Sequence, residues 1–428
     1  MTSVCVHGLG YIGLPTAAML ANYGYEVHGY DVDDGVRETL RDGGVHLDEP
    51  GLRAFVTQAL ESGQLTITDE VVPAKYQLIC VPTPFDEERK SPDLSYVTEA
   101  ARALTPQLRA GDTVILESTV PPGTSTGTLR PVLESGGLRA GEDFAIVHCP
   151  ETVMPGNIIT ELQENARIVG GINGVSTESA VRLYERFVRG EVHTTSDPTV
   201  AEFVKLIQNT YRDVNIALAN EIARIAHDYD IDSREAIDLA NEHPRVDILD
   251  PGPGVGGHCL PVDPWFLGVD SDSLWLIPAA RGVNDSMPSF VVELLREGLG
   301  TLAGKKIAVL GIAYKADVSD TRMSPGLALV RELRRTTPER ALADGGSPEP
   351  PAVSVHDPHV TETAFKLDDL ETATADADAL VVATHHQVYD DLDPSSLFDR
   401  MAGNVLVDTK GRLERALWQK AGFDVLRL

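Results

Sequence analysis

The chain has 428 residues, 42% of them hydrophobic, which predicts a globular protein of two or three domains rather than a single core. Its 65 acidic residues outnumber 36 basic ones and give a net charge of −29. A field of that sign repels nucleic-acid phosphates and anionic membranes, so we expect neither as a partner. The apolar runs are too short for a membrane span, and a strand pattern from residue 3 onward leaves no room for a secretory signal. We therefore expect a cytoplasmic protein.

The basic residues include only nine lysines. A diffuse acidic surface that is poor in lysine is tolerated where high salt screens its self-repulsion. The composition therefore favours a halophilic source, with an ordinary acidic cytosolic enzyme as the alternative.

Short apolar strands alternate with amphipathic helices in the first part of the chain, a pattern typical of βαβ units and a parallel sheet. We expect strands at 3–7, 26–30, 65–68, 77–81, 113–117, 143–148 and 166–170, and helices at 14–23 and 96–108. A helical pattern without glycine or proline then runs from 199 to about 234. A loop rich in glycine and proline at 250–264 interrupts the helices, which resume near 287.

A second alternating region begins at Lys305. Strands are expected at 306–311, 353–356, 379–383 and 405–408, and a polar loop at 336–351. The predicted fold class is α/β, with two Rossmann-like doubly wound domains joined by a central helical domain that contains a long spine helix. We place the boundaries at 1–196 for the first domain, 197–298 for the helical, dimerising domain with the 250–264 loop, and 299–428 for the last domain.

A glycine-rich turn, Gly8-Leu-Gly10-Tyr-Ile-Gly13, follows the first strand and opens a helix. Glycines at this spacing permit a tight turn and the close approach of a pyrophosphate to a helix N-terminus. Asp31 ends the second strand, where its carboxylate can accept a hydrogen bond from a ribose 2′-hydroxyl and would repel a 2′-phosphate. The cofactor predicted by this pattern is NAD rather than NADP.

Four other polar residues near the strand ends bear on the cofactor site. Asp33 and Asp34 could replace Asp31, but they lie past the strand end and are expected to be solvated. Thr83 and Thr119 follow the fourth and fifth strands, and ligands of open α/β sheets bind at those carboxyl ends. Helix capping is the alternative role for each threonine.

The four cysteines form no Cys-x-x-Cys pair, so neither a zinc site nor a disulfide framework is expected. Cys5, Cys80 and Cys149 lie in apolar, strand-like runs and are expected to pack as small hydrophobes. Cys259 instead lies in the loop Pro253-Gly-Val-Gly-Gly-His-Cys-Leu-Pro-Val-Asp, where glycines leave room for a ligand beside the sulfur. A thiol there can add to an aldehyde and, after hydride loss, hold the acyl group as a thioester. A packing cysteine in a tight turn is the alternative.

Polar residues elsewhere could complete this chemistry. Lys205, Asn209 and Arg212 share one face of the long helix, and an ammonium on that face could stabilise an oxyanion. The alternative is that these three residues form a polar, solvent-exposed stripe of the helix without a catalytic role. Asp263 and Glu151 are candidate general bases. The histidine before Cys259 has no second ligand pair at zinc spacing, so no metal is expected.

Taken together, the motifs resemble the UDP-glucose/GDP-mannose dehydrogenase family over essentially the whole chain. The resemblance is carried by the runs Gly8–Gly13, Val81-Pro-Thr-Pro84, Glu117-Ser-Thr-Val120, Lys205…Asn209, Gly256-Gly-His-Cys259 and Gly311-Ile-Ala-Tyr-Lys315…Asp320-Thr-Arg322. It implies an NAD-binding domain, a helical domain that forms a homodimer and a C-terminal UDP-binding domain. It also implies oxidation of a UDP-sugar by two NAD, through a cysteine thiohemiacetal and thioester.

Three further runs resemble the members of this family that act on UDP-N-acetyl-D-mannosamine: Cys149-Pro-Glu-Thr-Val-Met-Pro-Gly156, Arg212-Asp-Val-Asn-Ile-Ala217 and His243-Pro-Arg-Val-Asp-Ile-Leu249. Members that act on UDP-glucose more often have a lysine where this chain has Val262. Thr152 departs from the subgroup, in which arginine is common, whereas Val153 is retained. The implied reaction is oxidation of the sugar's C6 alcohol to a carboxylate, which supplies a uronic acid for glycan synthesis.

The resemblance also implies residue roles. Cys259 is the nucleophile and Lys205 the proton donor and acceptor. NAD contacts are implied for Tyr11, Ile12, Asp31, Thr83 and Thr119. Substrate contacts are implied for Thr152, Val153, Lys205, Asn209, Arg212, His243, Arg245, Gly256, Tyr314, Lys315, Arg322 and Lys410, with His243 and Arg245 coming from the partner subunit. Six of these residues are basic, the local positive pocket that a pyrophosphate needs in so acidic a chain.

Other functions stay open at this point. UDP-glucose or UDP-N-acetylglucosamine is the alternative substrate, because pocket shape decides which sugar is oxidised. A two-electron β-hydroxyacid-type dehydrogenase and a catalytically idle NAD-binding scaffold are more remote, because neither needs a thiol in a glycine loop.

Overall fold

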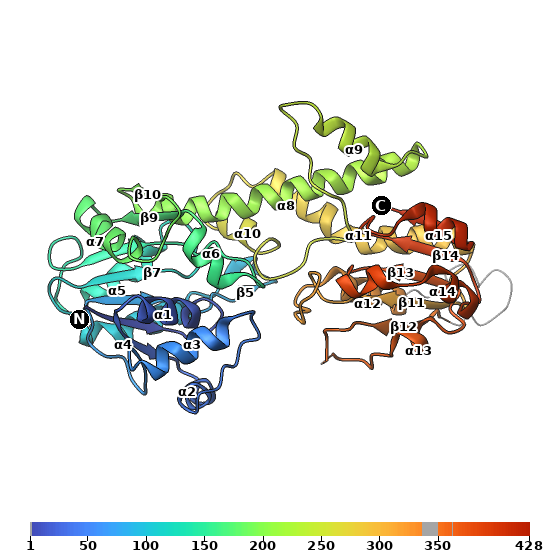
Figure 1. Ribbon diagram of the computed structural model, residues 1–428. Helices are drawn as coiled ribbons and strands as arrows, with labels where there is room; N and C mark the ends of the chain where they lie inside the picture. Colours follow the sequence, from blue (N-terminus) through green and yellow to red (C-terminus); the bar gives the residue numbers. More distant parts are fainter. Residues whose placement is uncertain (1, 336–349, 362) are drawn as a thin grey trace. The chain divides into compact units, whose positions relative to one another are not determined.

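A computed structural model describes residues 2–335, 350–361 and 363–428 (Figure 1). The chain forms two compact units, the first made of Met1–Gln208 and Trp265–Asp272 and the second of Asn209–Pro264 and Ser273–Leu428. The polar loop expected at 336–351 lies almost wholly outside the described residues. No helix in the described ranges is long and apolar enough to cross a membrane.

An eight-stranded sheet with the order β10-β9-β8-β7-β4-β1-β2-β3 forms the centre of the first unit. Its strands are β1 Ser3–His7, β2 Glu26–Tyr30, β3 Leu65–Thr68, β4 Tyr76–Ile79, β7 Thr113–Leu116, β8 Ala145–His148, β9 Arg167–Gly171 and β10 Val192–Thr195. β8 and β9 pair antiparallel, while the other neighbours pair parallel. The expectation of a purely parallel sheet was therefore wrong at this edge, and β10 had not been predicted.

Helices cover both faces of this sheet. They are α1 Gly13–Asn22, α2 Asp34–Arg41, α3 Leu52–Glu61, α4 Ser95–Leu104, α5 Arg130–Glu134, α6 Ile158–Glu164 and α7 Gly174–Tyr184. Alternate residues of one strand enter different cores: Leu78 packs with α1, α3, α6 and α7, whereas Ile79 packs with α4 and α5. A short hairpin, β5 Phe85–Asp86 and β6 Ser91–Pro92, follows β4. The doubly wound fold is thus confirmed for this unit.

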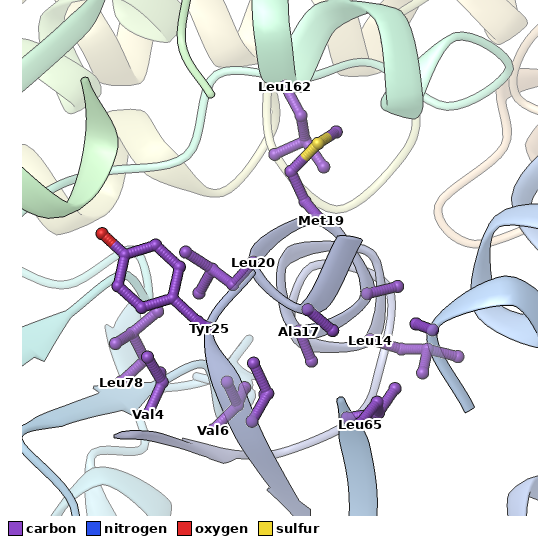
Figure 2. Close-up of a cluster of buried hydrophobic side chains, with 14 of the residues drawn as sticks. Val4, Val6, Leu14, Ala17, Met19, Leu20, Tyr25, Leu65, Leu78 and Leu162 are labelled. Carbon is purple, nitrogen blue, oxygen red and sulfur yellow. The ribbon is translucent and has the colours of Figure 1, made fainter. Parts of the chain in front are cut away.

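The core beneath α1 places the glycine-rich turn. The buried side of α1, including Leu14, Ala17 and Leu20, packs on Val4 and Val6 of β1 (Figure 2). This packing fixes the helix axis against the strand that precedes it. The turn at residues 8–13 is therefore held at both of its ends.

The helical middle begins with α8 Pro198–Asp228, 31 residues long, and continues with α9 Ser233–Asn241 and α10 Asp263–Leu267. The next helix, α11, spans Leu276–Leu299 and contains Pro288. The predicted start near 287 was wrong, because the helix begins at Leu276 and tolerates Pro288 in its interior.

A five-stranded parallel sheet with the order β12-β11-β13-β14-β15 forms the rest of the second unit. Its elements are β11 Lys306–Leu310, α12 Pro325–Arg335, β12 Ala352–His356, α13 Leu370–Thr374, β13 Ala379–Val382, α14 Pro394–Arg400, β14 Val405–Asp408, α15 Arg415–Ala421 and β15 Asp424–Arg427. Helices α11 and α12 pack on one face through Ile307 and Val309, and α14 and α15 on the other through Ala308 and Leu310. A second doubly wound domain after a helical middle confirms the predicted fold class.

Candidate functional site

The glycine-rich turn has the backbone geometry that a dinucleotide needs. Gly8 has φ +88°, and a Cβ there would lie 2.8 Å from the carbonyl oxygen of Cys80. A Cβ on Gly13 would overlap the carbonyl oxygen of Gly8. A Cβ on Gly10 would meet no protein atom within 4 Å. Gly8 and Gly13 are thus required by the fold, while Gly10 borders open space in which a pyrophosphate fits.

The N-terminus of α1 suits an anion for a second reason. Ile12 occupies the cap position, and no side chain among the described residues caps this helix end. Backbone N–H groups at residues 11–13 and the helix dipole therefore favour a negative ligand beside Tyr11 and Ile12. This cradle fits NAD, whose reactive part is a nicotinamide that accepts a hydride.

Asp31 is the acidic residue that faces the turn. Its Oδ2 accepts a hydrogen bond from the N–H of Leu9 at 2.7 Å. The carboxylate of Asp33 instead caps α2, and Asp34 forms an ion pair with Arg37. The geometry therefore favours Asp31 over the two alternatives as the ribose ligand.

Thr83 and Thr119 lie on two loops that are bonded to each other. The Thr83 hydroxyl donates to the carbonyl oxygen of Thr119 at 2.8 Å, and the Ser118 hydroxyl donates to that of Val81 at 2.6 Å. Neither threonine caps a helix among the described elements. The bonds bring both residues to the carboxyl edge of the sheet, where the sequence had placed them.

Glu151 is held in a buried ion pair. Its Oε2 lies 2.9 Å from Nη1 of Arg167, and its Oε1 accepts from the N–H groups of Thr152 and Val153. The pair is almost fully buried, with side-chain exposures of 1% for Arg167 and 7% for Glu151. A carboxylate so neutralised is better suited to shaping the 152–153 backbone than to taking a proton from substrate.

Lys205 lies on α8 one turn after a buried carboxylate, Glu202. Glu202 accepts from the N–H groups of Gly123 at 2.5 Å and Ser125 at 2.7 Å, and burial raises its pKa to about 7. Lys205 is half-buried and forms no ion pair with any described residue of its own unit. Sequence reasoning missed Glu202, although a carboxylate three residues before the lysine was visible.

The second unit brings Cys259, Asp263 and Asn209 together. Cys259 is exposed, and its carbonyl oxygen accepts from the N–H of Asp263 at 2.8 Å. Asp263, only 3% exposed, accepts at Oδ2 from Nδ2 of Asn209 at 2.6 Å. Cys5 and Cys149 are buried and Cys80 is half-buried, so Cys259 is the exposed thiol of the four.

Buried amides of the helices hold the start of the cysteine loop. Asn220 accepts from the N–H of Gly252 at 2.8 Å and bonds Asn284 at 2.9 Å. Pro288 has no N–H, so it leaves the carbonyl oxygen of Asn284 without its helical donor. A Cβ on Gly254 would lie 2.9 Å from that oxygen. Gly254 thus comes close to the Asn284 carbonyl at the point where Pro288 interrupts the helical hydrogen bonds.

The loop after β11 packs directly against the cysteine loop. A Cβ on Gly256 would lie 2.9 Å from Cβ of Tyr314, and one on Gly257 2.9 Å from its ring. The N–H of Gly257 donates to the carbonyl oxygen of Arg322 at 3.0 Å. Gly256, Tyr314 and Arg322, predicted from runs far apart in sequence, are therefore neighbours of the residues that lead to Cys259.

Arg322 supplies positive charge to this neighbourhood. Its pKa is raised, first by hydrogen bonds to Asp320 and further by the charges of Asp320, Tyr314 and Cys259. Arg322 and Cys259 therefore interact electrostatically, and the guanidinium can stabilise an anion that forms beside the sulfur. Burial and the charge of Arg322 lower the pKa of His258, which keeps that imidazole neutral.

Lys410 lies against the other end of the cysteine loop. A Cβ on Gly252 would be 2.6 Å from its Nζ. Burial, and then the charge of Arg234, lower the pKa of Lys410 to about 8. Arg212, His243 and Arg245 are exposed and form no hydrogen bond to residues 252–264 among the described contacts, so the structure does not bring them to this loop. Their predicted substrate contacts stay predictions.

Three family models match the chain: the NAD binding domain of the UDP-glucose/GDP-mannose dehydrogenase family over residues 2–188, its central domain over 199–286 and its UDP binding domain over 308–415. A UDP-N-acetyl-D-mannosamine dehydrogenase of Methanococcus maripaludis is 41% identical over 99% of this chain and 96% of its own. An NDP-N-acetyl-D-galactosaminuronic acid dehydrogenase of Ralstonia nicotianae is also 41% identical, over 96% of each chain.

A solved structure supports the same relationship. A UDP-D-ManNAc dehydrogenase from Pyrococcus horikoshii superposes with a TM-score of 0.89 at 40% identity. The match covers 100% of this chain and 99% of that one.

Proposed function

Because the chain belongs to the UDP-glucose/GDP-mannose dehydrogenase family and is an NAD-dependent UDP-sugar dehydrogenase, we propose that it oxidises the C6 alcohol of UDP-N-acetyl-D-mannosamine to UDP-N-acetyl-D-mannosaminuronate. The observation that carries the proposal is the exposed thiol of Cys259 on a glycine loop flanked by Tyr314 and Arg322. The archaeal relatives named for this substrate support the choice of sugar.

The chain's own residues divide the work as follows. Residues 8–13, Asp31, Thr83 and Thr119 hold NAD, which accepts one hydride in each of two oxidations. Lys205 takes the proton of the alcohol and then stabilises the oxyanion. Asn209 and Asp263, bonded to each other, lie beneath the cysteine loop, and Asp263 is the preferred base for the final water. Glu151, neutralised by Arg167, shapes the 152–153 backbone.

The covalent part of the reaction takes place on Cys259. The thiolate adds to the C6 aldehyde and forms a thiohemiacetal, which loses the second hydride and becomes a thioester. Water then adds to the thioester carbonyl and the C–S bond breaks, which gives the carboxylate and restores the thiol. The alcohol, water and two NAD⁺ are thereby converted to a carboxylate, two NADH and three protons.

The yield of NADH tests this mechanism. Wild-type protein is expected to give two NADH for each UDP-N-acetyl-D-mannosamine consumed. Cys259→Ala should stop at the aldehyde, so the carboxylate is lost and the rate falls at least about 1000-fold. Cys259→Ser keeps the size of the side chain but replaces a thiolate by a poorer nucleophile, and should slow sharply. Cys149→Ser is the matched control, since that cysteine is buried away from solvent.

Two results would contradict the thioester route. One is a yield of one NADH per sugar in the wild-type protein. The other is full turnover to the acid by Cys259→Ala. Either result would exclude the covalent step from the proposal, while the proposed binding of NAD and UDP-sugar would stand.

The sugar is tested by comparing substrates. The Ralstonia relative acts in its printed name on an N-acetyl-galactosamine derivative, so UDP-N-acetylgalactosamine is a second candidate. We expect kcat/KM to be highest for UDP-N-acetyl-D-mannosamine in a panel that also includes UDP-N-acetylglucosamine, UDP-glucose and UDP-N-acetylgalactosamine. A higher value for any other member would reassign the substrate without altering the chemistry.

We propose, in addition, that two copies associate through α8. Tyr211, Leu218 and Ile225 are 47% to 53% exposed and lie on one side of the helix at spacings of seven residues. An apolar stripe of this length is costly in water and suits an identical stripe on a second chain. A dimer would also allow the exposed His243 and Arg245 to serve the partner's site.

A further inference from the structure

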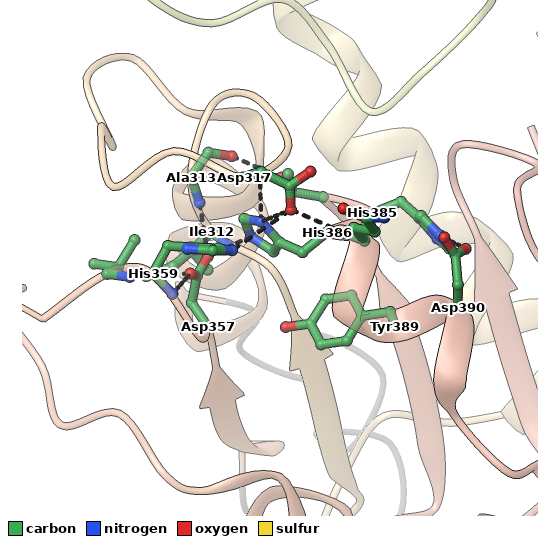
Figure 3. Close-up of polar contacts among 12 residues, drawn as sticks. Ile312, Ala313, Asp317, Asp357, His359, His385, His386, Tyr389 and Asp390 are labelled. Atoms are coloured by element: carbon green, nitrogen blue, oxygen red, sulfur yellow. Dashed lines mark hydrogen bonds and ion pairs between the residues drawn. The ribbon is translucent and has the colours of Figure 1, made fainter. Parts of the chain in front are cut away.

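His386, the second residue of a His-His pair after β13, is fully buried between two aspartates (Figure 3). Its Nε2 lies 3.0 Å from Oδ2 of Asp357, and its Nδ1 accepts from the backbone N–H of Asp317 at 2.9 Å. Because Nδ1 is an acceptor, the ring proton is on Nε2 and is donated to Asp357. The geometry therefore defines which ring nitrogen donates and which accepts.

Asp357 extends this contact to the beginning of the loop after β11. Its Oδ2 also accepts from the N–H groups of Ile312 at 2.7 Å and Ala313 at 3.0 Å. Burial alone would raise the pKa of Asp357, but the bonds from His386 and from backbone N–H groups hold it well below its usual range. The carboxylate is thus ionised and fixed by His386 and by backbone N–H groups.

Asp317 closes the same loop from its other end. Besides donating its N–H to His386, it accepts at Oδ1 from the N–H of Gln387 at 2.9 Å. Its φ is +59°, a left-handed conformation that these two bonds compensate. Residues 312–317 are therefore tied to the sheet at both ends, through Asp357 and through His386.

The tied segment contains two residues of the UDP-sugar site. Tyr314 and Lys315 lie between the anchored backbone groups of Ala313 and Asp317. Tyr314 in turn packs on Gly256 and Gly257, which lead to Cys259. A shift of residues 312–317 would therefore move both the substrate contacts and the support of the cysteine loop.

We propose that His386 is a positioning residue of the UDP-sugar site, which bridges Asp357 to the N–H of Asp317 and so fixes Tyr314 and Lys315. The proposal rests on the proposed function, in which these two residues contact the sugar nucleotide. His386 acts through the loop and does not touch substrate.

A divalent cation is the competing explanation for this cluster. Ligand atoms of Asp317, His359 and His386 lie within 4.8 Å of one another. However, both ring nitrogens of His386 are already engaged, one as an acceptor and one as a donor. A metal would have to displace the Asp317 N–H, so we favour the hydrogen-bonded bridge.

Variants of His386 separate the two halves of the bridge. His386→Ala removes both bonds, His386→Asn keeps an oxygen near the Nδ1 position, and His386→Gln keeps an amide donor near Nε2. We expect the Kd of UDP, measured by calorimetry, and the KM of the UDP-sugar to rise about ten-fold in His386→Ala and by less in the two amide variants. The KM of NAD should stay within two-fold, because residues 8–13 belong to the other compact unit.

Two neighbouring histidines serve as controls. His385→Asn alters the adjacent ring, which bonds the exposed Asp390 at 2.7 Å, and should leave UDP binding unchanged. His359→Ala removes a ligand of the competing metal site but no bond of the bridge, and should also bind UDP normally. Thermal melting of each variant verifies that it is folded.

Three results would overturn the proposal. Unchanged UDP affinity in folded His386→Ala removes the positioning role. A lower kcat with both KM values unchanged indicates only a smaller active fraction. An equal loss in His359→Ala, together with Zn²⁺-dependent UDP affinity, indicates the metal site. UDP calorimetry does not depend on turnover, so a wild-type protein that binds UDP but forms no NADH refutes the proposed function alone.

Discussion

The charge of Lys410 can be titrated under mild conditions. Its pKa is lowered to about 8 by burial and by Arg234, so it is charged below that pH and loses its charge above it. UDP carries its full charge above pH 7, since the second phosphate pKa is about 6. We predict that the Kd of UDP is constant between pH 7 and 7.5 and rises above pH 8, toward about ten-fold per pH unit, in calorimetric titrations up to pH 9.5.

Two variants test whether Lys410 is the group that titrates. Lys410→Met should bind UDP weakly at every pH and show no inflection near 8. Lys410→Arg should keep its charge to pH 9.5 and remove the inflection, because a guanidinium does not deprotonate in this range. UDP affinity of the wild-type protein that stays level to pH 9.5 would exclude Lys410 from the anion site.

The residues that could be predicted are those with a local signal. Gly10, Asp31 and Cys259 stand at a fixed spacing or in a distinctive loop, so their chemistry follows from the chain itself. The partners of His386 are instead 29 and 69 residues away, and only folding brings them together. A partial signal did exist, since Asp357 follows β12 as Asp31 follows β2, and each carboxylate binds N–H groups of the preceding strand's loop.

Among the elements, α8 offers a direct test of association. Ile225, 48% exposed, lies within the apolar stripe of α8. Ile225→Glu would place two carboxylates against each other in the proposed dimer and leave the monomer's core unchanged. We predict the monomer mass for this variant by light scattering and twice that mass for the wild-type protein. Val175→Glu on α7, a similar change at a 74% exposed residue, should not alter the mass.

Failure of this prediction has a clear form. A wild-type protein that is monomeric, or a dimer that survives Ile225→Glu, would show that α8 is not the interface. The roles of His243 and Arg245 as partner-subunit ligands would then be lost as well.

Elements were predictable where their own residues define the pattern. The strands at β1, β2 and β3 have the predicted bounds, because each is a short apolar run between turn residues. β10 was missed because Val192–Thr195 is a polar edge strand, exposed along much of its length. The start of α11 was misplaced because Pro288, tolerated within the helix, reads from sequence as a boundary.

At the scale of the whole molecule, the charge imbalance cannot be removed by pairing. Even if all 36 basic residues formed ion pairs, 29 of the 65 acidic residues would remain without a cation (65 − 36 = 29). Buried pairs such as Arg167–Glu151 and Arg281–Asp213 remove one acid for each cation, so they leave this excess unchanged. The surface therefore carries a net repulsion that only solvent ions can reduce.

We therefore predict that salt stabilises this protein. The Debye length falls from about 10 Å at 0.1 M salt to about 3 Å at 1 M, which suppresses repulsion between neighbouring carboxylates. If screening contributes roughly 3 kcal/mol, Tm should rise by about 3 °C between 0.1 and 2 M KCl in calorimetric scans, because the unfolding entropy of a chain this long is about 0.9 kcal/mol/K. NaCl should act equally if screening is the cause, whereas bound K⁺ would make KCl more effective. Sucrose at equal osmotic strength is the control for stabilisation by a solute that is excluded from the protein surface. A Tm that is level from low to molar salt would contradict both the repulsion argument and a halophilic source, because the acidic surface would then have no stability cost for salt to relieve.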